Sequence, residues 1–229
     1  MRTPPILLAV LAGLAVALAI SPVDRMTWAL ENAAFLAAVA FLVATRRRAP
    51  LSNVAYSLVF VFLALHELGA HYTYSLVPYG EWCARLSGQA VALDRNHYDR
   101  FVHLCFGLLV APALREFLVA TLALRGVAAS AMALCTCLAC SALYELVEWG
   151  AALAFGGEAT YAYVGSQGDP WDAQKDMALA AAGAALSLFL ATVRERARAS
   201  SSRAGTRPGP RPRRRWRELP ALRGTFPSR

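Results

Sequence analysis

The sequence predicts an all-α protein, a polytopic transmembrane helical bundle of about six spans. Hydrophobic residues make up 57% of the 229 residues and charged residues only 17%, which excludes an ordinary soluble domain. The apolar residues also come in long blocks, and a bilayer core of ~30 Å needs ~20 such residues per helix. The expected spans are residues 4–20, 26–45, 53–74, 99–119, 126–155 and 175–193.

The first expected span is the shortest. A cleavable signal peptide is an alternative interpretation of it, because Ala17 and Ala19 are small residues of the kind that precede a cleavage site. Under both interpretations the second span runs from the outside of the membrane to the inside.

Arginines cluster after the second, fourth and sixth expected spans. Cytoplasmic loops of membrane proteins carry an excess of Lys and Arg, so these clusters predict that both termini are cytoplasmic. The loops 75–98 and 156–174 then lie on the outer side, where tryptophans prefer the membrane interface. The arginines are Arg46, Arg47, Arg48, Arg125, Arg194, Arg196 and Arg198, and the tryptophans are Trp28, Trp82, Trp149 and Trp171.

The formal net charge of +8 belongs to the C-terminal segment 194–229. This segment holds 12 Arg and 2 acidic residues, which leaves a charge of −2 on the transmembrane domain, residues 1–193. A composition of Arg, Pro, Ser and Gly cannot bury a core, so we expect a disordered cytoplasmic tail. Such a tail binds anionic lipid head groups, and nucleic-acid binding is the less favoured interpretation.

Ionisable residues inside a membrane span are costly and mark candidate functional sites. Here they gather in four segments, which include all four histidines of the chain. The segments are HELGAHYTY (66–74), RNHYDRFVH (95–103), YELVEW (144–149) and QGDPWDAQKDM (167–177).

The depth of these residues in the membrane is similar. His66 and Glu145 lie ~20 and ~28 Å from the inner ends of their expected helices, at 1.5 Å per residue. Asp99, His103 and Asp176 lie at the outer starts of theirs. The sequence therefore predicts one polar layer near the outer face of the membrane.

Carboxylate and imidazole groups on facing helices can hold a divalent metal, or they can form an acid/base pair in which the carboxylate orients the imidazole. Side chains of this kind can also simply hydrogen-bond one another and hold loops in place. The expected catalytic residues are Asp99, His103, Glu145 and Glu148; the expected metal ligands are His66, Glu67, His71, Asp169, Asp172 and Asp176; and the expected substrate-binding residues are Arg100, Lys175, Trp149 and Trp171.

The segment HELGAH resembles the zinc-protease motif H-E-x-x-H but contains one residue too many. His66 and His71 are five residues apart, which places them ~140° apart around a regular helix. We therefore reject a metalloprotease on this motif.

These observations favour an outward-facing site that binds a polar lipid head group, with a divalent cation as cofactor. Membrane lipids are the expected partners. The sequence leaves open whether a reaction takes place; a hydrolase or transferase acting on a membrane lipid is the enzyme class that fits. The alternatives are a proton-coupled transporter and a non-catalytic membrane scaffold.

The four motifs together resemble those of the YjdF family of bacterial inner-membrane proteins. The resemblance covers about residues 20–193 and omits the Arg-rich tail. It implies a multi-pass protein of the bacterial inner (cytoplasmic) membrane.

A more distant similarity is to VanZ-like membrane proteins, which combine the patterns D-K-x-x-H, E-x-x-Q and D-x-x-x-N-x-x-G. Glu148 stands in place of the Gln of the second pattern, and Ala180 in place of the Asn of the third. The similarity implies a shared helical core and no particular reaction. The matching positions are Asp99, Arg100 and His103, then Glu145 and Glu148, then Asp176, Ala180 and Gly183.

Overall fold

The computed structural model describes residues 3–88, 95–155 and 166–205, and every regular element in these ranges is an α-helix. The all-α prediction is therefore confirmed. The helices are α1 (Thr3–Leu18), α2 (Arg25–Thr45), α3 (Asn53–His71), α4 (Tyr79–Ser87), α5 (Tyr98–Leu122), α6 (Gly126–Phe155) and α8 (Asp172–Gly205).

Five of these helices, α2, α3, α5, α6 and α8, are long and apolar enough to cross a membrane. The remaining long apolar helix, α1, has 16 residues and is the short first span that the sequence predicts. Large apolar side chains such as Val16, Leu36 and Phe189 lie exposed on the helix faces, as expected where a helix contacts lipid. The orientation of the bundle in the membrane remains a prediction.

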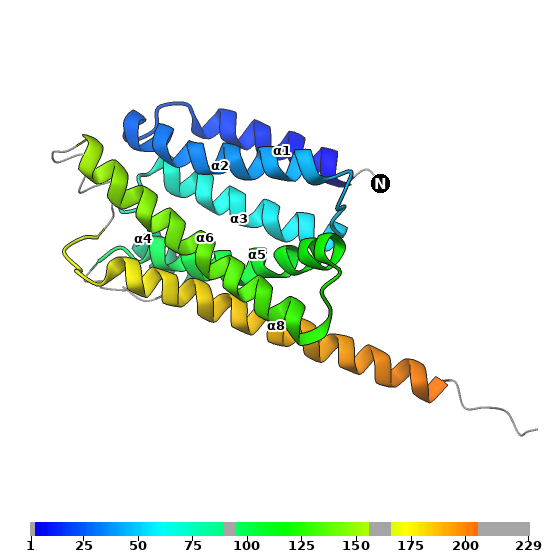
Figure 1. The fold of residues 1–229 in the computed structure, drawn as a ribbon. Coiled ribbons are helices and arrows are strands. Elements are labelled where there is room, and N and C mark those ends of the chain that lie inside the picture. Colours follow the sequence, from blue (N-terminus) through cyan, green and yellow to red (C-terminus); the bar gives the residue numbers. More distant parts are fainter. Residues whose placement is uncertain (1–2, 89–94, 156–165, 206–229) are drawn as a thin grey trace, which may run out of the picture. The chain divides into compact units, whose positions relative to one another are not determined.

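The bundle is organised around α3 and α5. The helices α1 and α2 each pack against α3, α3 packs against α5, and α5 packs against α6; Figure 1 shows α1, α2 and α3 from the top downwards, with α6 running diagonally across the view. One apolar cluster joins α1, α2, α3 and α5 and includes Leu11, Phe35 and Leu63. A second joins α5, α6 and α8 and includes Ala111 and Cys137.

The helices α5 and α8 approach each other so closely that their backbones touch. A Cβ atom added at Gly107 would lie 2.0 Å from the carbonyl oxygen of Ala180, and one added at Gly183 would lie 2.4 Å from that of Leu104. Small residues allow this approach between membrane helices, where packing replaces the hydrophobic effect as the driving force.

The third expected span starts where α3 starts, at Asn53, but its end differs from the structure. The sequence predicts a helix over residues 53–74, but α3 ends at His71. Thr73 and Tyr74 both adopt left-handed backbone conformations, with φ of 54° and 52°, and this turns the chain back over the helix. The ring of Tyr74 occupies the space beside Gly69, where a Cβ would lie 2.7 Å from it.

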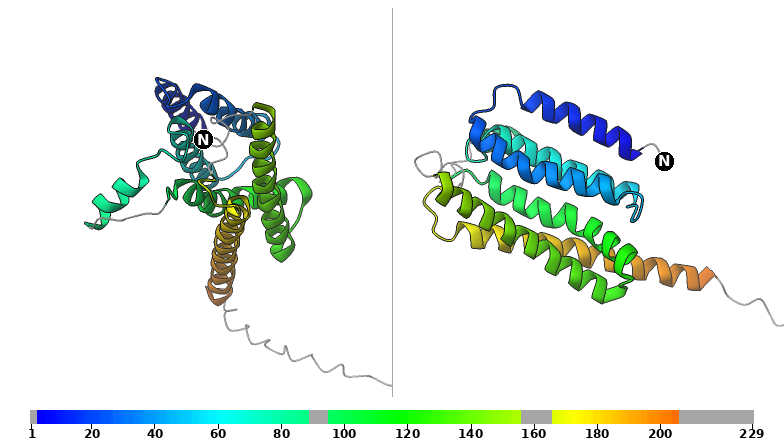
Figure 2. Two further views of the ribbon diagram at one scale, coloured as in Figure 1. Left: turned by 90° about the vertical axis from the view of Figure 1, so that its left-hand side faces the viewer. Right: turned by 45° about the horizontal axis from the view of Figure 1, so that its top comes forward.

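Two helices of the structure, α4 and α8, also differ from those that the sequence predicts. The sequence predicts a loop at residues 75–98, but this segment contains α4; this short helix projects sideways from the long ones (Figure 2, left). The last helix starts at Asp172 and ends at Gly205, beyond the expected range 175–193. Its Ala, Arg and Glu residues after position 193 favour helix, and α8 includes residues 194–205. Residues 206–229 lie outside the described part of the chain, and the disorder expected for the tail stays a prediction.

We expect Gly107→Ala and Gly183→Ala to destabilise the protein, because the added methyl groups have no space between α5 and α8. Overpacking of this kind typically costs about 1–3 kcal/mol. The thermal unfolding midpoint of the detergent-solubilised protein measures the effect. Gly150→Ala in α6 is the matched control, since nothing lies within 4 Å of its added Cβ, and an equal loss in all three variants would contradict the close approach.

Candidate functional site

Three buried aspartates meet where α5 and α8 begin. Asp99 lies in the first turn of α5, and Asp172 and Asp176 lie in the first two turns of α8. Each offers a carboxylate oxygen, and these oxygens all lie within 4.8 Å of one another. Asp176 is only 2% exposed, and its Oδ1 atom has no hydrogen-bond partner among the described residues.

The close helix contact explains why these aspartates meet. Asp99 precedes Gly107 by eight residues and Asp176 precedes Gly183 by seven, which is about 12 and 10.5 Å along an α-helix. The two helices run in the same direction from this end of the bundle (Figure 1). The backbone contact therefore sets both carboxyls at the same height.

Two arginines tie the segment before α8 to the start of α5. The guanidinium of Arg95 donates to both carboxylate oxygens of Asp172, at 2.7 and 3.1 Å. The guanidinium of Arg100 donates to Asp169 at 2.5 Å and to Asp172 at 3.1 Å. Bidentate pairs of this type combine charge attraction with fixed geometry, so the motifs at 95–103 and 167–177 bind each other.

Asn96 and Gln167 complete this connection. The side-chain oxygen of Gln167 accepts from the backbone amide of Asn96 at 2.9 Å, and the Asn96 side-chain amide donates to the carbonyls of Ser75 and Val77. These residues have a structural role, which is to hold the segments around the aspartates together.

Asp169 is bound by Lys175 as well as by Arg100. The ammonium group of Lys175 donates to it at 2.5 Å, and the backbone amide of Trp171 donates at 3.1 Å. These donors lower the pKa of Asp169 from 3.8 to about 2, with the hydrogen bond from Lys175 as the largest cause. Asp169 therefore binds cationic side chains and lies outside the group of three aspartates.

His103 lies beside this group. Its Nε2 atom is 3.3 Å from a carboxylate oxygen of Glu145 and 3.6 Å from one of Asp99, and its Nδ1 atom is 3.4 Å from the hydroxyl of Ser141. Glu148 is buried on the same helix as Glu145, three residues further along. The four residues expected to be catalytic are thus brought together.

His66 and Glu67 lie in a neighbouring cluster. His66 Nε2 is 3.1 Å from the backbone carbonyl of Glu31 and must donate, because a carbonyl only accepts. The hydroxyl of Tyr74 then donates to His66 Nδ1 at 2.6 Å. Both ring nitrogens are used, so His66 is engaged in structural hydrogen bonds. Glu67 is fully buried, and neither of its carboxylate oxygens has a partner within the described ranges.

The remaining expected site residues are more scattered. His71 Nδ1 donates to the carbonyl of Leu18 at 2.7 Å, which links α3 to the end of α1. Trp149 and Trp171 are 60% and 63% exposed and lie on the outside of the bundle. Of the expected metal ligands, only Asp172 and Asp176 join a group with metal-binding spacing in the part of the chain that the structure describes.

Glu31 of α2, which is 1% exposed, is absent from the site residues predicted from the sequence. The hydroxyl of Tyr144 on α6 donates a short hydrogen bond to its carboxylate. The rings of Tyr144 and His103 lie 6.0 Å apart, so Tyr144 stands between the two clusters. An acidic residue in the middle of an apolar block was the available signal, but Glu31 lacks the recognisable motif that surrounds the other polar residues.

These features define a multi-pass helical membrane protein with buried carboxyl and imidazole groups gathered at one end of its bundle. The chain belongs to the family described as predicted membrane protein (DUF2238), whose model matches residues 4–197. It is 40% identical over 169 residues to the inner membrane protein YjdF of Escherichia coli (strain K12), a match that covers 72% of this chain and 77% of that protein.

No solved structure gives a significant match. The family comparison confirms the resemblance to YjdF-like proteins and the expected location in the inner membrane. The similarity to VanZ-like proteins stays a prediction.

We expect Asp169→Asn to lower the thermal unfolding midpoint at pH 7, because Lys175 and Arg100 lose a charged partner. The pKa of Asp169 is depressed from 3.8 to about 2. The stabilisation from its charge is therefore fully present above the ordinary pKa of 3.8 and is lost as the pH falls from there toward about 2. Unfolding midpoints of the wild type and the variant between pH 7 and pH 2.5 measure this, and the difference should shrink below about pH 4. A difference that stays constant with pH would contradict the role of the charge.

We expect Tyr144→Phe to destabilise the protein by about 1–3 kcal/mol, because the buried carboxyl of Glu31 loses its hydrogen-bond donor. Thermal unfolding in detergent measures this change. Tyr72→Phe is the control, since no hydrogen bond of the Tyr72 hydroxyl is found within the described residues. A destabilisation equal to that of the control would show that the contact with Glu31 contributes nothing.

Proposed function

We propose that this protein binds a divalent cation between Asp99, Asp172 and Asp176, and that the cation helps to hold the phosphate-bearing head group of a membrane lipid. The observation that carries the proposal is the placement of three buried carboxylates within 4.8 Å of one another, with Asp176 Oδ1 left without a partner. A buried polar atom without a partner is costly, and a cation would satisfy it.

The spacing of the aspartates suits a hard divalent ion. Carboxylate oxygens bind Mg²⁺ at about 2.0–2.1 Å and Ca²⁺ at about 2.3–2.6 Å, so two ligands on opposite sides of an ion stand roughly 4–5 Å apart. Oxygen ligands favour Mg²⁺, Ca²⁺ or Mn²⁺ over softer metals. Arg95 and Arg100 neutralise Asp172 but make no ion pair with Asp176 among the described residues.

The cationic side chains nearby support an anionic ligand. Arg100 and Lys175 both bind Asp169, and Lys175 is about half exposed with 49% of its side chain accessible. A phosphate group could replace the Asp169 carboxylate between these two residues, and a cation on the adjacent aspartates would strengthen the attraction. Exposed Trp149 and Trp171 on the same end of the bundle suit the membrane interface, where head groups lie.

If a reaction takes place, His103 is the group positioned to move a proton. Its Nε2 atom faces Glu145 and Asp99, and a carboxylate in this position orients the imidazole and stabilises its charged form. Hydrolysis of a lipid head group, or its transfer to another acceptor, is the chemistry that such an arrangement supports.

A proton-coupled transporter has less support than a site for a lipid head group, because a transporter needs polar groups across the whole membrane. At the other end of the bundle, Glu116 accepts from the amide and hydroxyl of Ser52, and Arg115 donates to Ser130. These residues hold helix ends together. The apolar clusters occupy the space between them and the aspartates.

Binding of Mn²⁺ to the purified full-length chain tests the proposal. We expect one bound ion in the wild type and an affinity at least tenfold lower in Asp176→Asn, since even residues that only support metal ligands change affinity by about 10–100-fold. Glu81→Gln is the matched control because Glu81 is an exposed carboxyl whose only ion-pair partner in the described chain is Arg85.

A wild type that binds no Mn²⁺, or a control variant that loses as much affinity as Asp176→Asn, would contradict the cation site. Binding of a short-chain phosphatidylglycerol, measured with Mn²⁺ and with a chelator, tests the head-group part. Equal binding under both conditions would mean that the cation does not take part in holding the lipid. A lower folded yield of the site variants without any change in cell-envelope phenotype would favour a non-catalytic scaffold.

A further inference from the structure

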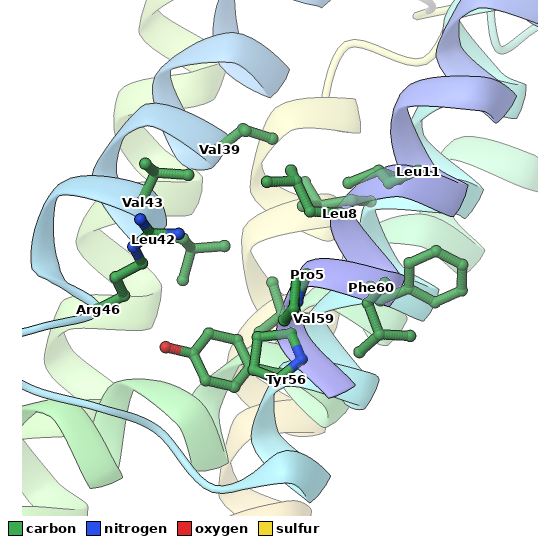
Figure 3. A pocket seen from close by; sticks show the side chains of 13 residues that line it. Pro5, Leu8, Leu11, Val39, Leu42, Val43, Arg46, Tyr56, Val59 and Phe60 are labelled. Carbon is green, nitrogen blue, oxygen red and sulfur yellow. The ribbon is translucent and has the colours of Figure 1, made fainter. Parts of the chain in front are cut away.

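A groove separate from the carboxylate site lies between α1, α2 and α3. The helices α1 and α2 each pack on α3 but make little contact with each other, which leaves a space along the surface of α3. This space has a cavity volume of about 80 Å³ and is lined mainly by apolar side chains of all three helices. Figure 3 shows these side chains converging from α1, α2 and α3.

The groove has a buried floor and an open rim. Its floor is formed by Leu11, Val59 and Leu63, which are 3–7% exposed as members of the apolar cluster around α3. Its rim carries Leu8 and Val43, which are 37% and 40% exposed. A cavity of this size does not enclose a whole ligand, since enclosed ligand pockets have about 300–1,000 Å³. It suits a single alkyl chain that lies along the bundle.

One end of the groove is polar. Arg46, the residue that caps the C-terminus of α2, lines the pocket together with Tyr56 of α3. Figure 3 shows the guanidinium of Arg46 and the hydroxyl of Tyr56 at the same end of the groove. Arg47 and Arg48 follow directly in the sequence and are exposed. This end therefore combines an apolar slot with a concentration of positive charge.

We infer that the groove holds one acyl chain of an anionic phospholipid, with the lipid phosphate at Arg46. The apolar floor and rim provide contacts for the chain. The guanidinium supplies charge-assisted hydrogen bonds to phosphate, for which its planar geometry is well suited. The bilayer itself supplies the ligand, and the charge at the mouth selects anionic head groups over zwitterionic ones.

This lipid site is independent of the proposed cation site. It lies at the end of the bundle formed by the C-terminus of α2 and the N-termini of α1 and α3. The aspartates lie at the other end of the bundle, where α5 and α8 start. A lipid bound here would fill the space between α1 and α2 and stabilise the packing of α1.

The test compares phosphatidylglycerol and phosphatidylcholine with identical acyl chains, added to the purified full-length chain in an uncharged detergent. Native mass spectrometry measures the lipid that stays bound. We expect the wild type to retain phosphatidylglycerol about fivefold more tightly, which corresponds to the attraction of one basic residue to a lipid with a net negative charge, a charge that zwitterionic phosphatidylcholine lacks. Arg46→Gln should reduce this preference to near unity.

Two further variants keep the test decisive. Arg125→Gln removes an exposed arginine outside the groove, so it should preserve the preference; an equal effect of Arg125→Gln and Arg46→Gln would overturn the site and indicate general surface charge. Leu8→Trp should fill the groove and reduce retention of both lipids. Equal retention of the two lipids by the wild type, or unchanged retention in Leu8→Trp, would also overturn the inference.

Discussion

The contact between the backbones of α5 and α8 is the constraint on which the polar end of the bundle depends. Gly107 and Gly183 each face the main chain of the other helix, with no room for a Cβ atom. This contact fixes the distance between the helices and the relative height of their first turns. Because Asp99 and Asp176 lie at nearly equal distances from it along the chain, their carboxyls meet although the two residues are far apart in sequence.

Hydrogen bonds between segments then complete the arrangement that the helix contact begins. Arg95 and Arg100 bind the aspartates that precede and open α8, and Asn96 binds both Gln167 and the turn after α3. Tyr74 returns over Gly69 to reach His66. Much of what makes the four motifs recognisable is therefore structural, and Asp99, Asp176 and His103 lie outside these contacts.

The membrane-spanning character could be predicted from the sequence because it depends on composition and length alone. The range 126–155 for α6 agrees with the structure at both ends, since a left-handed Gly126 marks its start. The end of α3 could not be predicted, because it depends on the packing of Tyr74 against Gly69. The same holds for α4, which is too short and too polar to stand out from a loop.

The candidate site was predictable as a region but not as a set of ligands. Spacing along one helix brings Asp99 and His103 together, and that pair is close in the structure. The contacts between residues of different helices depend on how the helices pack. The sequence carried no signal that Glu31 would meet Tyr144 or that His71 would bind the end of α1.

The lack of a side chain at Gly107 and Gly183, where α5 and α8 touch, has a mechanical consequence. Helices that touch through their main chains cannot move closer, and separating them would open a void. The backbone positions from which the side chains of Asp99 and Asp176 extend are therefore held apart by main chain, which cannot repack in the way that side chains can.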